Sequence, residues 1–418
     1  MRKLFNKNTP PVKPVNHVEV DDKHRKLKLI LIVLLLAVGI TLITVAIVDF
    51  LTVEPGWETI QADVKAGESS ADDFVLLYYL GAGDQAANLE KRALTALYTE
   101  AATDAFRIFH ESQQFDGLQN LAYLNSHPNE AVQLPEALYN ALALLQRYEN
   151  RDLFLAPIYQ EYVGLFSSAT DTAASMYDPD KSPEQAQYFA QLLAFTGDDE
   201  AIRLELLDNN TAKLSIREDY LQFAQANGIT VFADLYWMKN AFIADYLAQR
   251  LAAEGYTSGS LSSFDGYSRN LDSSAQTYRL NILDRVEQNI YMAATLEYTG
   301  AHAFVSLRNY PTSELAVQQY YQWADGSFLS CHIDSDGRSR TACNDLIGYS
   351  STLGCAEILM QMRDVYIADA LDADALTVLS ENGVQTIYCK DRTVYTSDSA
   401  AVIRDLFAKD NILYTRHK

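Results

Sequence analysis

The sequence is poor in basic residues and lacks the short motifs of several large enzyme classes. Its 418 residues include 33 Lys and Arg against 55 Asp and Glu, a net charge of −22. A nucleic-acid binder needs a basic face to meet the phosphate backbone, so this balance argues against a nucleic-acid partner. There is no Gly-x-Ser-x-Gly elbow, no His-Glu-x-x-His and no Walker loop. Nothing therefore favours a serine hydrolase, a zinc protease or a nucleoside triphosphatase.

Cysteine is scarce and occurs only late in the chain. The four residues are Cys331, Cys343, Cys355 and Cys389, with no Cys-x-x-Cys and no Cys/His pair at zinc spacing. A zinc site is therefore not expected. Four cysteines allow three complete disulfide pairings, and spacing cannot choose among them. Isolated buried thiols are at least as well supported, because Cys is among the most buried residue types.

One long apolar run is present near the N-terminus. Residues 29–48, LILIVLLLAVGITLITVAIV, contain no charge. As a helix, a run of this length spans about 30 Å, the thickness of one hydrocarbon core. We expect a transmembrane helix. No small-x-small cleavage pattern follows it, which favours an uncleaved anchor over a signal peptide.

The charges that flank the run predict its orientation. Residues 1–28 carry eight Lys and Arg against three acids, whereas Asp49, Glu54 and Glu58 follow the run. The positive-inside rule then predicts a single-pass protein of the cell membrane with a cytoplasmic N-terminus. We expect four parts: a cytoplasmic basic tail (1–28), the membrane helix (29–48), a stalk or linker (49–72) and an extracytoplasmic domain (73–418).

The expected domain mixes helical and strand-like patterns. Helices are predicted from Asp84 to Glu111, from Pro135 onward, from Ser182-Pro183 to Gly197, and from Lys239 to Ala253. Strands are predicted at 228–235, 301–307, 328–333 (turning at Asp336-Gly337), 384–389 and 393–397. Because helices and strands do not alternate regularly, the pattern predicts an α+β fold of helices and antiparallel sheet. A chain of this length can bury one large core or form a two-lobed domain.

The stretch 234–245, DLYWMKNAFIAD, opens a predicted helix directly after a strand-like run, a junction where many enzymes hold a phosphate. Together with later stretches, in order over residues 75–418, it resembles the FAD:protein FMN transferases, the ApbE-like family. These enzymes take FAD and Mg²⁺ and attach FMN to a Thr or Ser of an exported redox protein. The family pattern here is Asp-Leu-Gly-Gly-Ile-x-Lys-Gly-Tyr-x-x-Asp. Asp234 and Asp245 match it, whereas Tyr236 and Trp237 replace its two glycines.

The loss of these glycines has a direct physical meaning. Glycine lets backbone N–H groups approach a phosphate and permits positive φ, whereas Tyr236 and Trp237 would crowd that space. Packing of both aromatic rings is favoured over flavin stacking. Downstream, the turn that is Gly-Gly-Asp in the family is Phe264-Asp265-Gly266. The resemblance implies cofactor-binding roles for Asp234, Asp245 and Asp265.

Two further stretches extend the resemblance. Residues 331–339, CHIDSDGRS, are similar to the family's His-x-x-Asp-Pro-x-Thr-Gly without its Pro and Thr, which makes His332 the candidate catalytic residue. The alternative is a hairpin histidine followed by an Asp-Gly turn. Residues 117–125, GLQNLAYLN, resemble a segment that helps to build the flavin site, and they offer Asn125 for cofactor binding. Residues 151–162, RDLFLAPIYQEY, stand where the family has a glycine-rich stretch.

A third stretch, residues 367–383, IADALDADALTVLSENG, is similar to the family's magnesium motif, Ala-Asp-Ala-Leu-x-Thr-Ala. Depending on the alignment, the carboxylate is Asp369 or Asp374, and Thr377 lies on the same helix face as Asp374. The resemblance implies these three residues as metal ligands. A solvated acidic helix start is the alternative.

The sequence departs from the family pattern at the ligand-contacting motifs, whereas the patterns that predict helices and strands are retained. The resemblance therefore predicts a membrane-anchored, ApbE-like protein whose FMN transferase activity is weakened or lost, with FAD and Mg²⁺ as cofactors if it acts. Two alternatives stay open. One is a non-catalytic binding or scaffold protein of an extracytoplasmic redox system, and the other is a flavin-carrying electron-transfer protein. The expected partners are the membrane and an exported flavoprotein or membrane redox complex.

Overall fold

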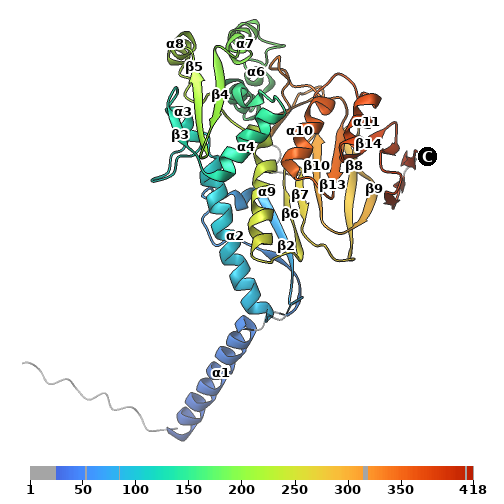
Figure 1. The fold of residues 1–418 in the computed structure, drawn as a ribbon. Coiled ribbons are helices and arrows are strands. Elements are labelled where there is room, and N and C mark those ends of the chain that lie inside the picture. Colours follow the sequence, from blue (N-terminus) through green and yellow to red (C-terminus); the bar gives the residue numbers. More distant parts are fainter. Residues whose placement is uncertain (1–24, 52–53, 84, 314–318, 410–411, 418) are drawn as a thin grey trace, which may run out of the picture. The chain divides into compact units, whose positions relative to one another are not determined.

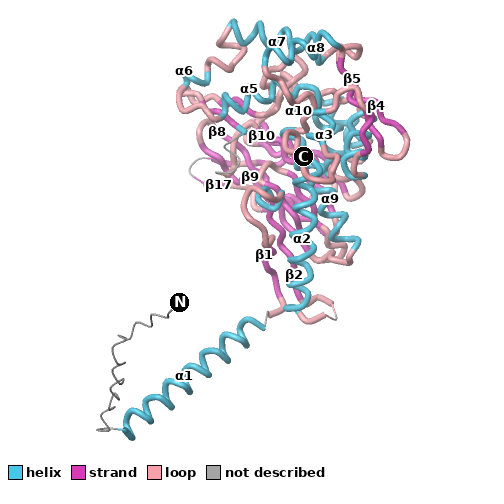
Figure 2. Tube along the Cα trace, turned by 90° about the vertical axis from the view of Figure 1, so that its left-hand side faces the viewer, coloured by secondary structure: helices cyan, strands magenta, loops and turns pink. Residues whose placement is uncertain are grey.

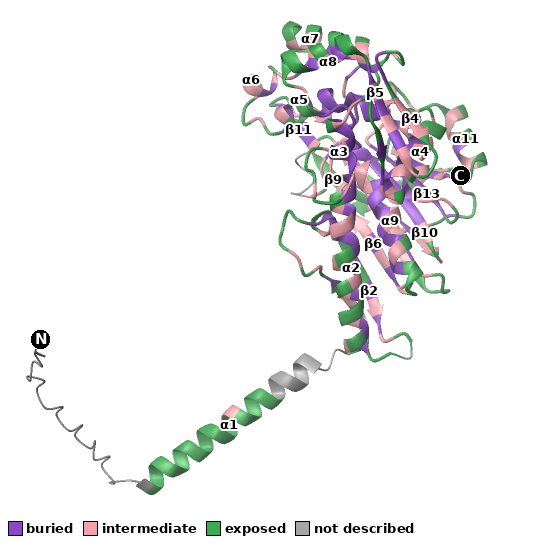
Figure 3. Cartoon of the chain, turned by 60° about the vertical axis from the view of Figure 1, so that its left-hand side comes forward, coloured by how far each residue is buried: buried purple, intermediate pink, exposed green. Residues whose placement is uncertain are grey.

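The structure of the chain is a computed structural model that describes residues 25–51, 54–83, 85–313, 319–409 and 412–417. It divides into two compact units, residues 1–53 and 54–418. The first contains helix α1 (Arg25–Leu51). Within it, Lys26–Thr44 has a mean hydropathy of 2.7 and is long and apolar enough to cross a membrane (Figure 3). The expected membrane helix, 29–48, lies inside α1, and residues 1–24 of the expected tail lie outside the described residues.

The second unit is built on a nine-stranded sheet (Figure 1). Its neighbouring strands are antiparallel, except for the parallel pair at one edge, β15 and β19. The strand order is β1 (Gly56–Ile60), β2 (Phe74–Leu80), β6 (Gly259–Ser263), β7 (Tyr267–Asn270), β10 (His302–Arg308), β13 (Asp345–Ser350), β14 (Gln385–Lys390), β15 (Thr393–Thr396) and β19 (Thr415–Arg416).

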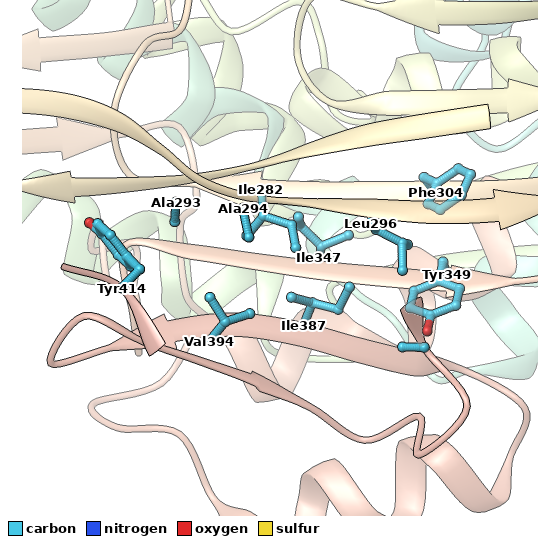
Figure 4. Packing of buried hydrophobic residues seen from close by; sticks show 11 residues of the cluster. Ile282, Ala293, Ala294, Leu296, Phe304, Ile347, Tyr349, Ile387, Val394 and Tyr414 are labelled. Carbon is cyan, nitrogen blue, oxygen red and sulfur yellow. The ribbon is translucent and has the colours of Figure 1, made fainter. Parts of the chain in front are cut away.

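A three-stranded sheet packs on one face of this large sheet. Its order is β16 (Val402–Arg404), β9 (Asn289–Thr299) and β8 (Thr277–Val286). Ile282, Ala294 and Leu296 from β8 and β9 are buried in one cluster with Ile347 and Ile387 from β13 and β14 (Figure 4). This cluster forms the core between the two sheets, as expected for stacked antiparallel sheets with apolar inner faces.

Helices cover the opposite face of the large sheet. The helices α9 (Lys239–Ala253) and α10 (Cys355–Tyr366) contact its strands, and α2 (Ala87–Phe109) packs on α9. At Gly348 in β13, a Cβ atom would lie 1.9 Å from Sδ of Met362 in α10. The close approach of helix and sheet therefore requires glycine at this position. The helix α11 (Ala373–Glu381) contacts β14 and α10.

A second lobe contains a small sheet with the helices that surround it (Figure 2). The sheet order is β3 (Ala131–Gln133), β5 (Thr211–Ile216) and β4 (Ile202–Leu207). The helices of this part of the chain are α3 (Leu121–Ser126), α4 (Glu136–Arg147), α5 (Ala156–Phe166), α6 (Asp171–Ala174), α7 (Pro183–Thr196) and α8 (Glu218–Asn227). The α+β class and the two-lobed arrangement are confirmed.

Shorter elements complete the described part of the chain. They are the 3-10 turns η1 (Ser70–Asp73), η2 (Asp152–Leu155) and η3 (Tyr236–Met238), and the strands β11 (Tyr320–Gln322), β12 (Phe328–Ser330), β17 (Ala408–Lys409) and β18 (Ile412–Leu413). The predicted strand at 328–333 shortens to β12, and Gly337 takes the positive φ of its turn, +72°.

Several boundaries differ from those expected. The segment 49–72 is not a stalk throughout, because β1 pairs along its length with β2 and the folded unit begins at Glu54. The composition did not indicate this strand, because Pro, Gly and Ser surround a strand-like pattern of only five residues. The expected cap Asp84 lies outside the described residues, and α2 begins at Ala87.

Candidate functional site

The predicted phosphate junction lies between α8 and α9, and the chain before it is not a strand. Residues 228–235 form an irregular segment instead of the strand that their apolar pattern predicts. The side chain of Asn125 makes the hydrogen bonds to this segment that a neighbouring strand would otherwise make. Its Oδ1 accepts from the backbone N–H groups of Phe232 (3.1 Å) and Ala233 (2.9 Å), and its Nδ2 donates to Ala233 O (2.9 Å). Asn125 is 3% exposed. Its side chain therefore holds the backbone of this segment and has little capacity left for a ligand.

Tyr236 occupies the first glycine position with a backbone conformation that glycine favours. Its φ is +42°, in the left-handed region. The ring is stacked on Tyr159 of α5, with centroids 4.7 Å apart and an interplanar angle of 22°. The hydroxyl groups of both tyrosines are buried and have no hydrogen-bond partner within the described chain. In the family that this chain resembles, glycines occur both at the position of Tyr236 and in the stretch that corresponds to residues 151–162, which contains Tyr159. In this chain, the two tyrosines pack against each other.

Trp237 occupies the second glycine position and is 2% exposed. Its carbonyl accepts a hydrogen bond from Tyr267 Oη of β7 at 2.9 Å, and its indole Nε1 has no partner among the described residues. The His332 ring meets the indole edge-to-face, with centroids 5.0 Å apart, and meets Tyr366 of α10 at the same distance. Aromatic side chains thus fill the interior beside η3.

His332 lies in this aromatic environment, and no carboxylate among the described residues pairs with its ring. It is 4% exposed, and its Nδ1 lies 3.1 Å from Ser330 Oγ. Burial lowers the pKa of His332 to about 3, so the ring is neutral at physiological pH. The nearby Asp334 accepts from the backbone N–H groups of Asp336 and Arg338, as in an Asx turn, and pairs with Arg340. The hairpin alternative for this histidine fits these contacts better than an acid/base pair.

Around the start of α9, acids surround one lysine. Lys239 Nζ donates to Glu111 Oε2 at 2.7 Å and lies 4.0 Å from Asp234 Oδ1. Burial alone would lower the pKa of Lys239, but these carboxylates outweigh it and the pKa is raised. Asp234 is buried, accepts from Tyr236 N at 2.8 Å, and has a pKa raised by burial. The lysine charge is therefore already compensated by protein carboxylates and is not available to a phosphate.

The other two predicted cofactor residues also have partners within the protein. Asp245 accepts from the backbone N–H groups of Cys355 and Ala356, both at 2.9 Å, and pairs with Arg269 Nη1 at 2.7 Å. It therefore caps α10. Asp265 accepts from Asn240 Nδ2 at 3.0 Å, and burial raises the pKa of Asp265 to about 6. Its other oxygen is buried without a partner among the described residues.

Two of the predicted metal ligands, Asp369 and Thr377, make contacts within the protein. Asp369 has a side chain that is 86% exposed and pairs with Arg340. Thr377 donates its hydroxyl to Ala373 O within α11, and Asp372 caps this helix by accepting from Asp374 N. Across the described residues, no group of three or more His, Cys, Asp and Glu is placed to hold a metal ion. The contacts of α11 match the alternative, a solvated acidic helix start.

The structure thus brings together Tyr236, Trp237 and His332 and keeps Asp374 and Thr377 on a separate helix. Sequence reasoning missed the pairing of Lys239 with Glu111 and the stacking of Tyr159 on Tyr236. Tyr159 could have been found from the sequence, because it lies in residues 151–162, which stand where the family has a glycine-rich stretch. All four cysteines are free thiols, as the second interpretation of the sequence expects, and Cys331 and Cys355 are buried.

Comparisons with known proteins identify the fold. No family model matches the sequence, and no curated protein matches it either. Among solved structures, the ApbE protein of Thermotoga maritima is similar with a TM-score of 0.55 and 12% identity, over 84% of this chain and 97% of that one. The flavin transferase ApbE of Vibrio cholerae gives 0.52 and 12%, over 83% and 98%. The apo flavinyl transferase ApbE of Pseudomonas stutzeri gives 0.51 and 13%, over 82% and 94%. At these identities the likeness establishes an ApbE-like fold alone.

Proposed function

We propose that this chain is a membrane-anchored, ApbE-like binding protein that does not transfer FMN. The observation that carries the proposal is the packing at η3, where Tyr236 stacks on Tyr159 and Trp237 packs against His332. In the resemblance, these positions supply the glycine backbone that approaches the FAD phosphates. Filled by buried rings, the junction has no room for a diphosphate.

The residues that would perform the transfer are also occupied or misplaced. Burial holds the pKa of His332 at about 3, far below the operating range of a general acid or base at neutral pH. Asp369 pairs with Arg340, and the hydroxyl of Thr377 donates to Ala373 O within α11. The residues present therefore do not fit FAD with Mg²⁺.

The anchor and its flanking charges support the place of action. The helix α1 is apolar over Lys26–Thr44, and the excess of basic residues precedes it. By the positive-inside rule, the unit of residues 54–418 lies outside the cytoplasm. The proposed role is docking to an exported flavoprotein or a membrane redox complex, with the ApbE-like fold as a scaffold.

The test is a calorimetric titration of FAD with Mg²⁺ into the full chain in phospholipid nanodiscs. A double variant, Tyr236→Gly/Trp237→Gly, is titrated in parallel, and Met176→Gly serves as a control because Met176 is an exposed apolar residue in a turn. We expect no heat of binding from the unmodified chain or the control, and weak binding from the double variant. Micromolar, Mg²⁺-dependent binding by the unmodified chain, or covalent flavin on a Thr-containing acceptor, would refute the proposal.

A further inference from the structure

A second region of the protein, away from η3, has the form of a ligand site. A cavity of about 400 Å³ lies between the large sheet and β8. Its lining includes Ser260 and Ser262 of β6, Ser268 of β7, Trp57 of β1 and Tyr278 of β8. Small-molecule sites in proteins are typically concave and about 300–1,000 Å³ in volume. None of the aromatic residues that fill the η3 region lines this cavity.

Short side chains in the sheet create the hollow. In the register of the large sheet, Ser260 lies opposite Leu77, Ser262 opposite Ser268, and Ser268 opposite Phe304. Directly opposite residues in paired strands project to the same face, so the serines form a low area between larger neighbours. The strand β8 passes above a face that three serine side chains do not fill.

The polar groups of the cavity are not used by the protein. Within the described chain, the hydroxyls of Ser260, Ser262 and Ser268 have no hydrogen-bond partner, unlike the neighbouring Ser263 Oγ, which accepts from Tyr267 N. Each hydroxyl can donate one hydrogen bond and accept two, so a bound polar molecule would find several free groups along one wall.

Aromatic rings form the opposite wall and mouth. The Trp57 ring is 38% exposed and meets Tyr278 edge-to-face with centroids 6.2 Å apart. Tyr278 in turn stacks on Tyr298 with centroids 5.8 Å apart. Such rings supply apolar contact area at little entropic cost, next to groups that make directional hydrogen bonds.

The charges around the cavity indicate an uncharged ligand. No Asp or Glu is among the lining residues. The two lining arginines are already paired, Arg269 with Asp245 at 2.7 Å and Arg279 with Glu297 and Asp405, both at 3.5 Å. A ligand here therefore meets neutral donors and acceptors on one side and aromatic surface on the other.

We propose that this cavity binds a saccharide. A sugar ring presents C–H groups on its faces, which pack on aromatic rings, and hydroxyl or acetamido groups at its rim, which exchange hydrogen bonds with serine hydroxyls. The serine row and the Trp57–Tyr278 pair match these two requirements. The inference does not depend on the proposed loss of FMN transfer.

The test uses the full chain in nanodiscs, because glucoside and maltoside detergents would compete for the site. The probes are N-acetylglucosamine, N,N′-diacetylchitobiose and maltose, followed by saturation-transfer NMR and by tryptophan fluorescence. Only Trp57 among the three tryptophans is substantially exposed, so a ligand in the cavity should change its emission. We expect at least one probe to saturate the protein, and Ser262→Val/Ser268→Val and Trp57→Ala each to weaken binding about tenfold or more.

The controls separate a lost site from a misfolded protein. Ser399→Val makes the same chemical change at an exposed serine and should bind as the unmodified chain does. Circular dichroism should be the same for every variant. The proposal is wrong if no probe saturates below about 10 mM, if binding survives both cavity variants, or if inorganic phosphate binds there in preference to the sugars.

Discussion

At the scale of single residues, Tyr236 shows how the fold can keep a backbone shape while its chemistry changes. A non-glycine residue in the left-handed region costs about 1–2 kcal/mol, and Tyr236 has a φ of +42°. Burial of the ring against Tyr159 offsets this strain. The sequence identified the glycine position correctly, but it could not reveal the ring that stacks there, because Tyr159 lies in another segment.

This strain makes Tyr236→Gly and Tyr236→Ala an informative pair of variants. Both delete the ring, and each should lower the free energy of unfolding by about 3 kcal/mol or more before strain is considered. Only glycine relieves the positive φ, so we expect the glycine variant to be more stable than the alanine variant by about 1 kcal/mol. Thermal unfolding followed by circular dichroism measures the difference. An alanine variant at least as stable as the glycine variant would contradict the strained conformation.

His332 gives a prediction about pH. Its pKa in the folded protein is about 3, below the ordinary value of 6.5, because burial disfavours the imidazolium ion. Below pH 6.5, His332 therefore binds a proton in the unfolded chain but not in the folded chain. The free energy of unfolding falls as the pH decreases from 6.5 to about 3. At pH 4 this loss amounts to about 3 kcal/mol.

The measurement compares unfolding free energies at pH 7 and pH 4 for the unmodified chain and for His332→Phe. The variant should lose about 3 kcal/mol less between the two pH values. His417→Phe changes an exposed histidine and should follow the unmodified chain. Equal pH dependence in all three proteins would show that His332 is not buried in its neutral form.

At the scale of elements, predictions succeeded where a signal was local. Helix α7 begins and ends where Ser182, Pro183 and Gly197 predict, and α9 spans Lys239–Ala253 as expected. Residues 228–235 failed as a strand because Asn125, distant in sequence, satisfies the backbone there. The sequence also could not show that Asp245 caps α10, because Cys355, the first residue of α10, lies 110 residues later in the chain.

Asp245 connects three elements, which makes its removal costly. Asp245 lies in α9, and its carboxylate both caps α10 and pairs with Arg269 of β7. In Asp245→Asn the ion pair is lost and Arg269 keeps no charged partner. Because both side chains are 27% exposed, we expect a loss of about 2 kcal/mol, less than for a fully buried pair.

Hydrogen exchange distinguishes this effect from general destabilisation. The amides of Cys355 and Ala356, which donate to Asp245, should exchange faster in Asp245→Asn than in the unmodified chain. Glu100→Gln removes one of the two carboxylates, Glu100 and Asp104, that pair with Arg250 at the surface, and it should cost less than about 0.5 kcal/mol. Unchanged exchange at the start of α10 would rule out the capping role.

At the scale of the whole molecule, the composition predicted an anchor followed by one large folded unit, and the structure moves the start of that unit from residue 73 to Glu54. The difference matters because β1 is the edge strand of the large sheet. Ile60 is 2% exposed, Glu58 pairs with Lys91, and Asp63 N donates to Thr99 Oγ1. The segment is therefore attached to both β2 and α2.

This attachment predicts different behaviour for two soluble fragments. A fragment of residues 54–418 keeps β1, whereas one of residues 73–418 loses it and exposes the edge of β2, which invites pairing with other chains. Burial of Ile60 and the pairing of β1 with β2 also disappear, so we expect the shorter fragment to be less stable by at least about 3 kcal/mol. Thermal unfolding and light scattering measure both effects. If the two fragments melted together and both stayed monomeric, β1 would be dispensable and the folded unit would begin where the sequence placed it.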